Sequence, residues 1–221
     1  RASKHRVTPR DPYADVAGGF ELENLAYPEQ LKFKRQVVID SLAKFKPYGY
    51  RNYEVRPTIA APQEYGYRNK AQFQVRMIDG HVAAGLYKPD SHDLVDMQEC
   101  AVQMPQTMHV VRTMVKLIEE LNIPVYDEDH NSGIIKTLAM RESWTTGEVQ
   151  LTIITNTPKL IHKHQLLAAI ADQLPEVVSV MQNVNPGDTP LVWGDQMIHL
   201  AGKDATTESL MGLDFKLSAR S

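Results

Sequence analysis

The sequence predicts an α+β fold in which antiparallel sheets, built from β-hairpins, pack against helices. Two observations favour this class: apolar and polar residues alternate with period two in several runs, and short turns of the hairpin type follow these runs. A third is the absence from the sequence of the glycine-rich loops that bind dinucleotides or nucleoside triphosphates. The 221 residues suffice for one large domain or two modest ones.

The start of the chain predicts a connector followed by one helix. Residues 1–27 lack periodicity and contain several prolines and glycines, which is typical of an irregular segment. From Pro28 onward, apolar residues recur at helical spacing among cations, and Pro47 with Gly49 should end the helix. We therefore expect residues 1–50 to form a connector and a basic amphipathic helix.

The remaining residues, 51–221, predict the main α+β domain, and the pattern is compatible with two hairpin-plus-helix modules, 51–125 and 131–221. The first module should contain strands over Ala71–Met77, His81–Tyr87 and Leu94–Met97, a turn at Asp79 and Gly80, and a helix over Gln103–Asn122. The second should contain strands over Gly133–Arg141, Val149–Thr155, Val177–Gln182, Gln196–Leu200 and Leu213–Ala219, and a helix over Lys163–Gln173.

Charge is unevenly distributed along the chain. Residues 1–76 contain 14 Lys and Arg against 8 Asp and Glu, a net of +6, whereas residues 77–221 have a net of −9. A basic first third suits a surface that contacts a polyanion. The same cations could equally decorate a solvated helix, and the charge count alone does not decide between the two.

Composition also restricts the class of protein. No apolar run approaches the length of a membrane span, and the single cysteine, Cys100, can form neither an internal disulfide nor a thiolate zinc site. We expect a cytoplasmic, monomeric protein that does not associate with membranes. The chain begins without methionine and ends at Ser221 directly after a strand-like run, which indicates a piece of a longer protein.

Several residue types that often carry chemistry are poorly placed for it. His162 and His164 are two residues apart at a helix start, so they point to different sides. Cys100 follows an acidic residue that would raise its pKa and make it a poor nucleophile. The acidic loop 127–130 lacks the spacing of a calcium loop. A metal-dependent enzyme built on these groups is the least favoured hypothesis.

The strongest local signal is the loop Tyr65-Gly66-Tyr67-Arg68-Asn69-Lys70-Ala71-Gln72, which enters the first predicted strand. Its eight residues include two aromatic rings, two cations and two amides, which offer stacking surfaces, phosphate-seeking charge and donors for base edges. This mixture favours contact with RNA. An aromatic-capped hairpin with ordinary edge charges is the alternative interpretation.

Several ordered motifs carry a resemblance to a known family. They are Tyr67-Arg68-Asn69-Lys70-Ala71-Gln72, Gly85-Leu86-Tyr87 with Ser91-His92-Asp93-Leu94-Val95-Asp96, Gln182-Asn183-Val184-Asn185, and Gly212-Leu213 through Leu217-Ser218-Ala219-Arg220-Ser221. Together they resemble the RNA (uracil-5-)-methyltransferases of the RumA/TrmA type, nearer to the 23S ribosomal RNA branch. The likeness runs from about Asp11 to Ser221.

The resemblance implies that the chain is the connector and central domain of an S-adenosylmethionine-dependent enzyme. The family's Rossmann-like catalytic domain, with its catalytic cysteine, glutamate and cofactor loop, would lie beyond this chain. The chain itself would then hold no catalytic and no cofactor-binding residue, and we expect it to be inactive alone. A transfer RNA (uracil-5-)-methyltransferase fragment, and a stand-alone RNA-binding or ribosome-associated adaptor, remain the alternatives.

Many relatives in the family hold a four-iron four-sulfur cluster with four cysteines. Cys100 matches the fourth of these, whereas the other three positions are Asp11, Ala17 and Phe20 in this sequence. One thiolate cannot hold the cluster, so the resemblance implies a member without iron-sulfur or other metal.

The resemblance also implies site residues. Arg68 and Lys70 would contact the RNA around the target uridine, with Asn69 and Gln72 as supporting amides. The helix cations Lys32, Lys34 and Arg35 would extend the electrostatic footprint, and His92, Asn183 and Asn185 are weaker candidates because turn and strand-end roles explain them equally well.

Overall fold

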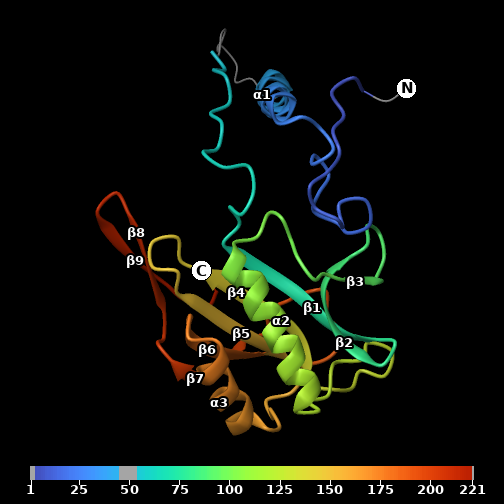
Figure 1. Ribbon diagram of the computed structural model, residues 1–221, viewed down its shortest axis with the longest axis vertical. Helices are drawn as coiled ribbons and strands as arrows, with labels where there is room; N and C mark the ends of the chain where they lie inside the picture. Colours follow the sequence, from blue (N-terminus) through green and yellow to red (C-terminus); the bar gives the residue numbers. More distant parts are fainter. Residues whose placement is uncertain (1–2, 45–53, 221) are drawn as a thin grey trace.

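The computed structural model describes residues 3–44 and 54–220, and it confirms the α+β class (Figure 1). Its helices are α1 (Tyr27–Lys44), α2 (Pro105–Glu120) and α3 (Lys163–Gln173). Its strands are β1 (Lys70–Ile78), β2 (His81–Tyr87), β3 (Leu94–Asp96), β4 (Ile135–Glu142), β5 (Val149–Thr155), β6 (Val177–Val184), β7 (Gln196–Gly202), β8 (Thr206–Leu210) and β9 (Leu213–Leu217). No helix within the described residues combines the length and the apolar character that a membrane crossing requires.

One seven-stranded sheet forms the centre of the molecule, in the order β3-β2-β1-β4-β5-β6-β7. Pairing of β1 with β4 joins the strands of the two predicted modules into this single sheet. All neighbours are antiparallel except β5 and β6, which are parallel because α3 carries the chain back to the same end of the sheet. The predicted antiparallel sheet thus includes one helical crossover that the alternation pattern did not indicate.

The first hairpin follows the sequence closely. Asp79 and Gly80 join β1 to β2, and both have positive φ angles, 51° and 84°, as a two-residue type I′ turn requires. Strand β1 alternates from Lys70 to Arg76, so that Phe73 and Val75 are buried while the residues between them are only half-buried. This alternation assigns opposite faces of the sheet to the apolar and the polar residues of β1.

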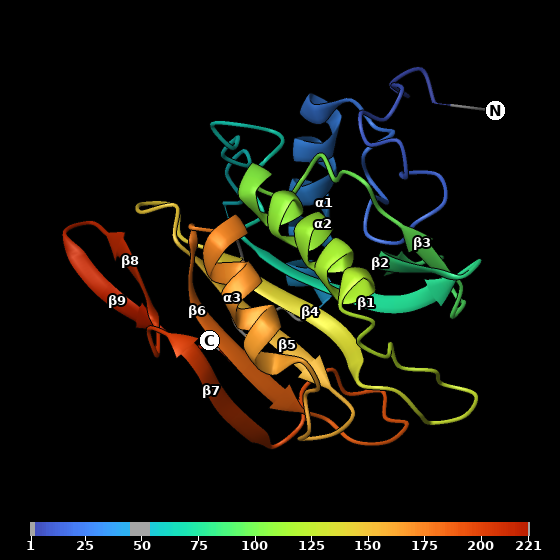
Figure 2. The same cartoon turned by 60° about the horizontal axis from the view of Figure 1, so that its bottom comes forward.

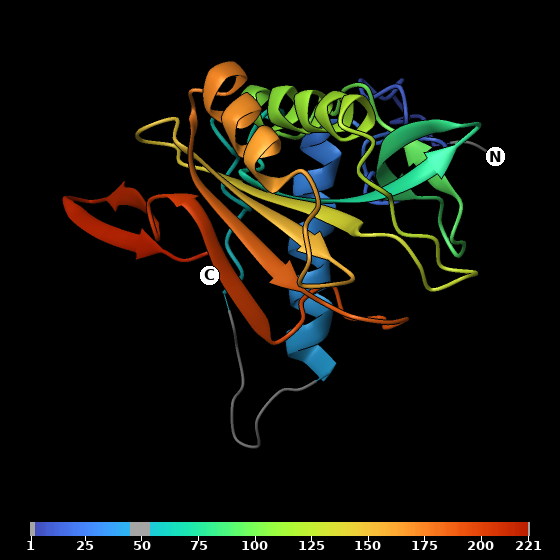
Figure 3. The same ribbon diagram turned by 90° about the horizontal axis from the view of Figure 1, so that it is seen from below.

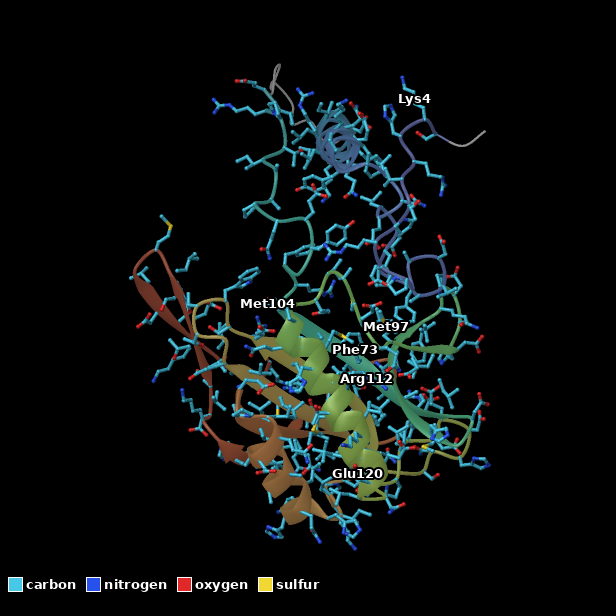
Figure 4. The ribbon with its side chains drawn as sticks, in the orientation of Figure 1. Lys4, Phe73, Met97, Met104, Arg112 and Glu120 are labelled. Atoms are coloured by element: carbon cyan, nitrogen blue, oxygen red, sulfur yellow. The ribbon has the colours of Figure 1, made fainter. Side chains whose placement is uncertain are left out.

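Helices α2 and α3 cover one face of the sheet (Figures 2 and 3). The hydrophobic core lies between these two helices and the sheet. Its largest fully buried side chains include Phe73, Met97, Met114, Ile118, Leu138, Leu151, Ile153 and Leu166. Figure 4 labels Phe73, Met97 and Arg112, and Arg112 donates to Met97 O (3.3 Å). The Arg112 guanidinium donates to Asp96 Oδ1 (2.6 Å), which fixes the helix to strand β3. We call the opposite side of the sheet the polar face.

Helix α1 forms where the sequence predicts a helix, but its apolar residues do not pack as an amphipathic helix should. None of its described residues is buried, and Phe33 and Val38 are about half exposed. The helix stands apart from the sheet (Figure 1), held by hydrogen bonds from Arg35 Nε to Val55 O (2.9 Å) and from Thr58 Oγ1 to Leu31 O (3.0 Å). Its predicted end at residues 47–49 lies outside the described residues.

The end of the chain contains a second hairpin, β8–β9, where the sequence predicts only one strand over Leu213–Ala219. The tip residues Met211 and Gly212 both adopt positive φ angles, and the two strands form a separate sheet that projects from the main one (Figure 1). Strand β9 lies within the predicted strand and alternates apolar and polar residues, whereas β8 was missed because its sequence, Thr206-Thr207-Glu208-Ser209-Leu210, has no such alternation.

Candidate nucleic-acid interface

The loop of residues 65–72 is held rigidly by its own backbone. Arg68 N–H donates to Val102 O (2.8 Å), and Arg68 O accepts from Met104 N–H (3.1 Å). The next residue, Asn69, accepts from Glu142 N–H (2.9 Å) at the end of β4. The loop is therefore clamped between the segment before α2 and the edge of the sheet, and its side chains extend from a fixed platform.

Three cations gather at this platform. Arg68 is exposed and its Nε donates to Lys70 O (3.1 Å), while Lys70 lies directly opposite Arg141 in the β1–β4 register. Burial and then the neighbouring charges of Arg141 and Arg68 lower the pKa of Lys70. Like charges placed opposite each other destabilise a sheet, and the Glu208 carboxylate acts on Arg141 in the opposite sense.

A cavity of about 610 Å³ lies beside these cations. Arg68, Lys70, Gln72 and Tyr87 line its wall on the sheet side, and its lining includes no aspartate or glutamate. Two cations and an amide that face one hollow suit a phosphodiester, which is an anion with several acceptor oxygens. The structure thus brings together three of the predicted RNA-binding residues at one hollow, which we call the cationic cavity.

Residues 18–20 of the connector, together with Cys100 from the segment between β3 and α2, line the other side of the cationic cavity. Four buried residues, Asp11, Ala17, Phe20 and Cys100, are the positions that the resemblance associates with a metal cluster. Burial raises the pKa of the Cys100 thiol to about 11, and the Asp11 carboxylate already accepts hydrogen bonds from Ala101 N–H (2.7 Å) and Tyr13 N–H (2.8 Å).

These side chains do not fit an iron-sulfur cluster. They supply one protonated thiol, one engaged carboxylate and two apolar groups, whereas such a cluster requires several thiolates. Within the part of the chain that the structure describes, no group of three or more histidine, cysteine, aspartate or glutamate side chains is placed to hold a metal ion. Packing and hydrogen bonds here fix the connector to the sheet.

The aromatic residues of the loop lie near helix α1. Tyr65 stacks beneath the Arg10 guanidinium, 4.7 Å from its carbon to the ring centroid, and Tyr67 is half exposed. Both tyrosines line a hollow of about 210 Å³ with Lys34. Of the three predicted helix cations, Lys34 is therefore the one that the structure places at the loop.

The other two helix cations have partners within the chain. Lys32 Nζ binds Glu29 at 2.6 Å, and Arg35 donates to the backbone of Val55. Exposed pairs of this kind are weak, so both cations can still contribute to a long-range electrostatic field.

His92 lies away from the cationic loop. It belongs to a second polar cluster, where its Nδ1 is 3.2 Å from Glu128 Oε2 and its ring centroid is 5.6 Å from that of Tyr87. Arg76 bonds both Glu128 and the Tyr87 hydroxyl in the same cluster. Sequence reasoning missed Arg76 and Arg141, although the alternation of Lys70, Gln72, Gln74 and Arg76 along one strand face was a signal that could have found the first.

Asn183 and Asn185, the weaker candidates, have structural roles. Both are buried, and the Asn183 side chain exchanges hydrogen bonds with Gly194 N–H (2.8 Å) and Gly194 O (3.0 Å). Asn185 Nδ2 donates to Leu191 O (2.6 Å) and Val192 O (3.0 Å). These bonds hold the segment after β6 in place.

Several known proteins are similar in sequence to this chain. Proteins described as uncharacterized RNA methyltransferases from Lactiplantibacillus plantarum, Enterococcus faecalis and Listeria innocua are 62%, 48% and 44% identical to the chain over 220, 220 and 221 residues. The chain is similar to RNA methyltransferases over its whole length. It spans about half of theirs, 46% of the first and 48% of the other two. No family model matches the chain.

A solved structure shares the fold. The Pyrococcus abyssi tRNA (uracil-54, C5)-methyltransferase in complex with S-adenosyl-L-homocysteine superposes on the entire chain with a TM-score of 0.74, at 23% identity, over 48% of its own length. At this level of identity the likeness concerns the fold alone. It places the seven-stranded sheet and its helices within an architecture already seen in one half of a larger protein.

Proposed function

We propose that this chain is the RNA-contacting part of an S-adenosylmethionine-dependent RNA (uracil-5-)-methyltransferase that acts on 23S ribosomal RNA. The observation that carries the proposal is the cationic cavity, where Arg68, Lys70 and Gln72 line one hollow. Similarity over the whole chain to proteins described as RNA methyltransferases supports the choice of enzyme class.

The chemistry explains why such an enzyme needs this surface. A methyltransferase that acts on a ring carbon of uracil must take the base out of its stack, so the flanking strand has to be held in an unpaired form. Arg68 and Lys70 would bind phosphates of that strand, and Asn69 and Gln72 would donate to base edges or sugars. Lys34, with Lys32 and Arg35 further along α1, would add a sequence-independent attraction.

The methyl donor would bind outside this chain. The solved neighbour is described in complex with S-adenosyl-L-homocysteine, which is the product left when S-adenosylmethionine gives up its methyl group. This supports the cofactor class for the whole protein. We assign no catalytic residue to the present chain, so the chain alone should not methylate RNA. We further propose that residues 51–221 act as one substrate-handling unit, to which the connector and α1 are attached.

An RNA-binding assay tests this proposal. Labelled 23S ribosomal RNA fragments would be titrated with the chain at several salt concentrations, using Arg68→Ala, Lys70→Ala and the control Lys116→Ala. Lys116 is an exposed cation on α2 paired with Glu120, so it matches the charge change outside the site. Each loop variant should weaken binding and reduce the salt slope by about one, whereas the control should leave both unchanged.

Three results would change the proposal. If neither loop variant weakens binding, the loop assignment is wrong. If the chain binds transfer RNA more tightly than ribosomal RNA at equal salt, the transfer RNA branch replaces the ribosomal one. If the purified chain transfers a radiolabelled methyl group from S-adenosylmethionine to RNA, the expected inactivity is refuted.

A further inference from the structure

A second cavity, of about 380 Å³, adjoins the cationic cavity on the polar face of the sheet. Tyr87 lines both cavities, and β1 contributes Gln72 to the first and Gln74 to the second. These two glutamines are two residues apart on the same strand face, which separates them by roughly 7 Å along the strand. The second cavity is therefore the next position along the same strand.

The charge of the second cavity differs from that of the first. Arg76 and Lys136 line it together with Glu128 and Asp188, so that two cations are balanced by two carboxylates. The Arg76 guanidinium bonds Glu128, and Lys136 Nζ is held by Gly187 O (2.7 Å) and by one further carbonyl. A cavity balanced in this way offers little net attraction to a phosphate.

The same cavity offers aromatic and amide groups instead. His92 is exposed at its rim with its ring close to that of Tyr87, and Tyr126 lies below, with the Lys136 ammonium 4.4 Å from its ring centroid. The Gln74 amide oxygen accepts from Thr137 Oγ1 (2.8 Å), which fixes the side chain so that its nitrogen can serve as a donor. Rings for stacking and fixed polar groups for a base edge are the requirements for holding an unstacked base.

We propose that this second cavity, which we call the base cavity, binds one unstacked base of an RNA strand whose adjacent phosphate lies in the cationic cavity. His92 and Tyr87 would supply the stacking surface, and Gln74 would donate to the base edge. The inference rests on the proposed RNA contact, and it adds a base-binding position that the cationic loop alone does not provide. Two neighbouring cavities with different charge would then bind the two chemically different parts of one nucleotide.

The test compares RNAs that differ only in a missing base. A fluorescently labelled single-stranded RNA of about 12 nucleotides would be titrated with the chain, together with a series in which each position in turn is abasic. With the unmodified chain, removal of the base at one position should weaken binding roughly fivefold or more, because stacking on a single side chain contributes that much.

His92→Ala should produce the same loss with the complete RNA. When His92→Ala is tested with the RNA that lacks the sensitive base, affinity should not fall further, because both changes remove the same interaction. His92→Phe should restore the affinity, since it keeps a ring at the rim. Neither His92 variant should change the salt dependence of binding, whereas the loop variants Arg68→Ala and Lys70→Ala should reduce it.

His81→Ala is the matched control. The His81 side chain is 79% exposed and 3.0 Å from Glu119, closely similar to His92 at 85% and 3.2 Å from Glu128, but it lines neither cavity. The inference is overturned if every abasic position has the same effect, or if His92→Ala binds as well as His81→Ala. If Arg68→Ala and Lys70→Ala also have no effect on binding, the proposed function fails as well. If these two variants weaken binding but His92→Ala does not, only the base cavity is refuted and the proposed function is retained.

Discussion

Replacement of Glu142 tests how the start of α2 is stabilised. The helix begins after Met104, which supplies no side-chain cap, and Glu142 at the end of β4 performs that role from across the sheet. Its Oε2 accepts from Thr107 N–H (3.1 Å) and from Thr107 Oγ1 (3.2 Å), and both residues are buried. A carboxylate at this position also interacts favourably with the helix dipole.

The magnitude follows from the bonds that are lost. In Glu142→Ala the Thr107 N–H still reaches Met104 O (3.1 Å), but the Thr107 hydroxyl loses its acceptor in a buried position. An unsatisfied buried polar group costs about 1–3 kcal/mol, and the vacated volume adds to this, so we expect a loss of roughly 2–3 kcal/mol. For a chain of this size the melting temperature should fall by about 4–12 °C.

Glu142→Gln separates the hydrogen bond from the charge. Burial raises the pKa of Glu142, with Glu176 as a smaller like-charge contribution, while the bonds from Thr107 act in the opposite direction. Because the folded pKa exceeds the ordinary value of 4.5, this group stabilises the native state fully below that value and less as pH rises through the folded pKa. Glutamine keeps an acceptor oxygen and does not titrate. The stability of the Glu142→Gln variant relative to the unmodified chain should therefore increase from pH 4.5 to pH 7.5.

Thermal unfolding followed by circular dichroism measures both effects. Glu120→Ala is the control, since Glu120 is exposed on the same helix and pairs only with Lys116. The reasoning is refuted if Glu142→Ala melts within a degree or two of Glu120→Ala, or if the Glu142→Gln difference does not change with pH.

Two further predictions concern the connector and the segment between β3 and α2 on which it packs. Cys100 is buried and its pKa is raised to about 11, so a disulfide reagent should label the native chain slowly at neutral pH and rapidly after unfolding; fast native labelling would contradict the assigned burial. Asp11→Ala should release the connector from residues 98–101 and increase the cleavage of the connector by protease. Asp11→Asn keeps one acceptor oxygen and should be cleaved less than Asp11→Ala. Equal cleavage of the two variants would show that the carboxylate does not fix the connector.

The sequence predicted most of the sheet because its strands alternate in the way their burial requires. Phe73 and Val75 are buried, and the hairpin turn at Asp79 and Gly80 fixed the register of β1 with β2. The parallel pairing of β5 with β6 could not be predicted in the same way. Strand β5 is buried at every position and β6 at most of them, with polar residues among the apolar ones in both, so alternation does not indicate their direction, which depends on where α3 returns the chain.

The failures on α1 and on β8–β9 have a common cause. Both elements have exposed apolar side chains, for example Phe33 in α1 and Met211 and Leu213 in the hairpin. Helical or alternating apolar patterns predict burial only when a partner surface lies within reach in the folded chain. In the hairpin the attachment is polar instead, since Glu208 accepts from Trp144 N–H (2.7 Å) and Thr145 Oγ1 (2.8 Å).

The candidate site shows where local sequence reasoning ends. The loop motif located Arg68, Lys70 and Gln72 because they are contiguous, and these residues do line one cavity. Arg141 and Lys136 come from a strand more than 60 residues further along, and only the pairing of β1 with β4 brings them to the same region of the sheet.

The same pairing explains why two cavities of different character adjoin. Residues at alternate positions of β1 project onto the polar face, so each step along the strand presents a new side chain to the same surface. Lys70 is opposite Arg141, and the result is a cationic end, whereas Gln74 is opposite Thr137 and lies among balanced charges. Under the proposed function, a cationic position followed by a neutral one would match a phosphate followed by a base, and this order arises from register rather than from any single motif.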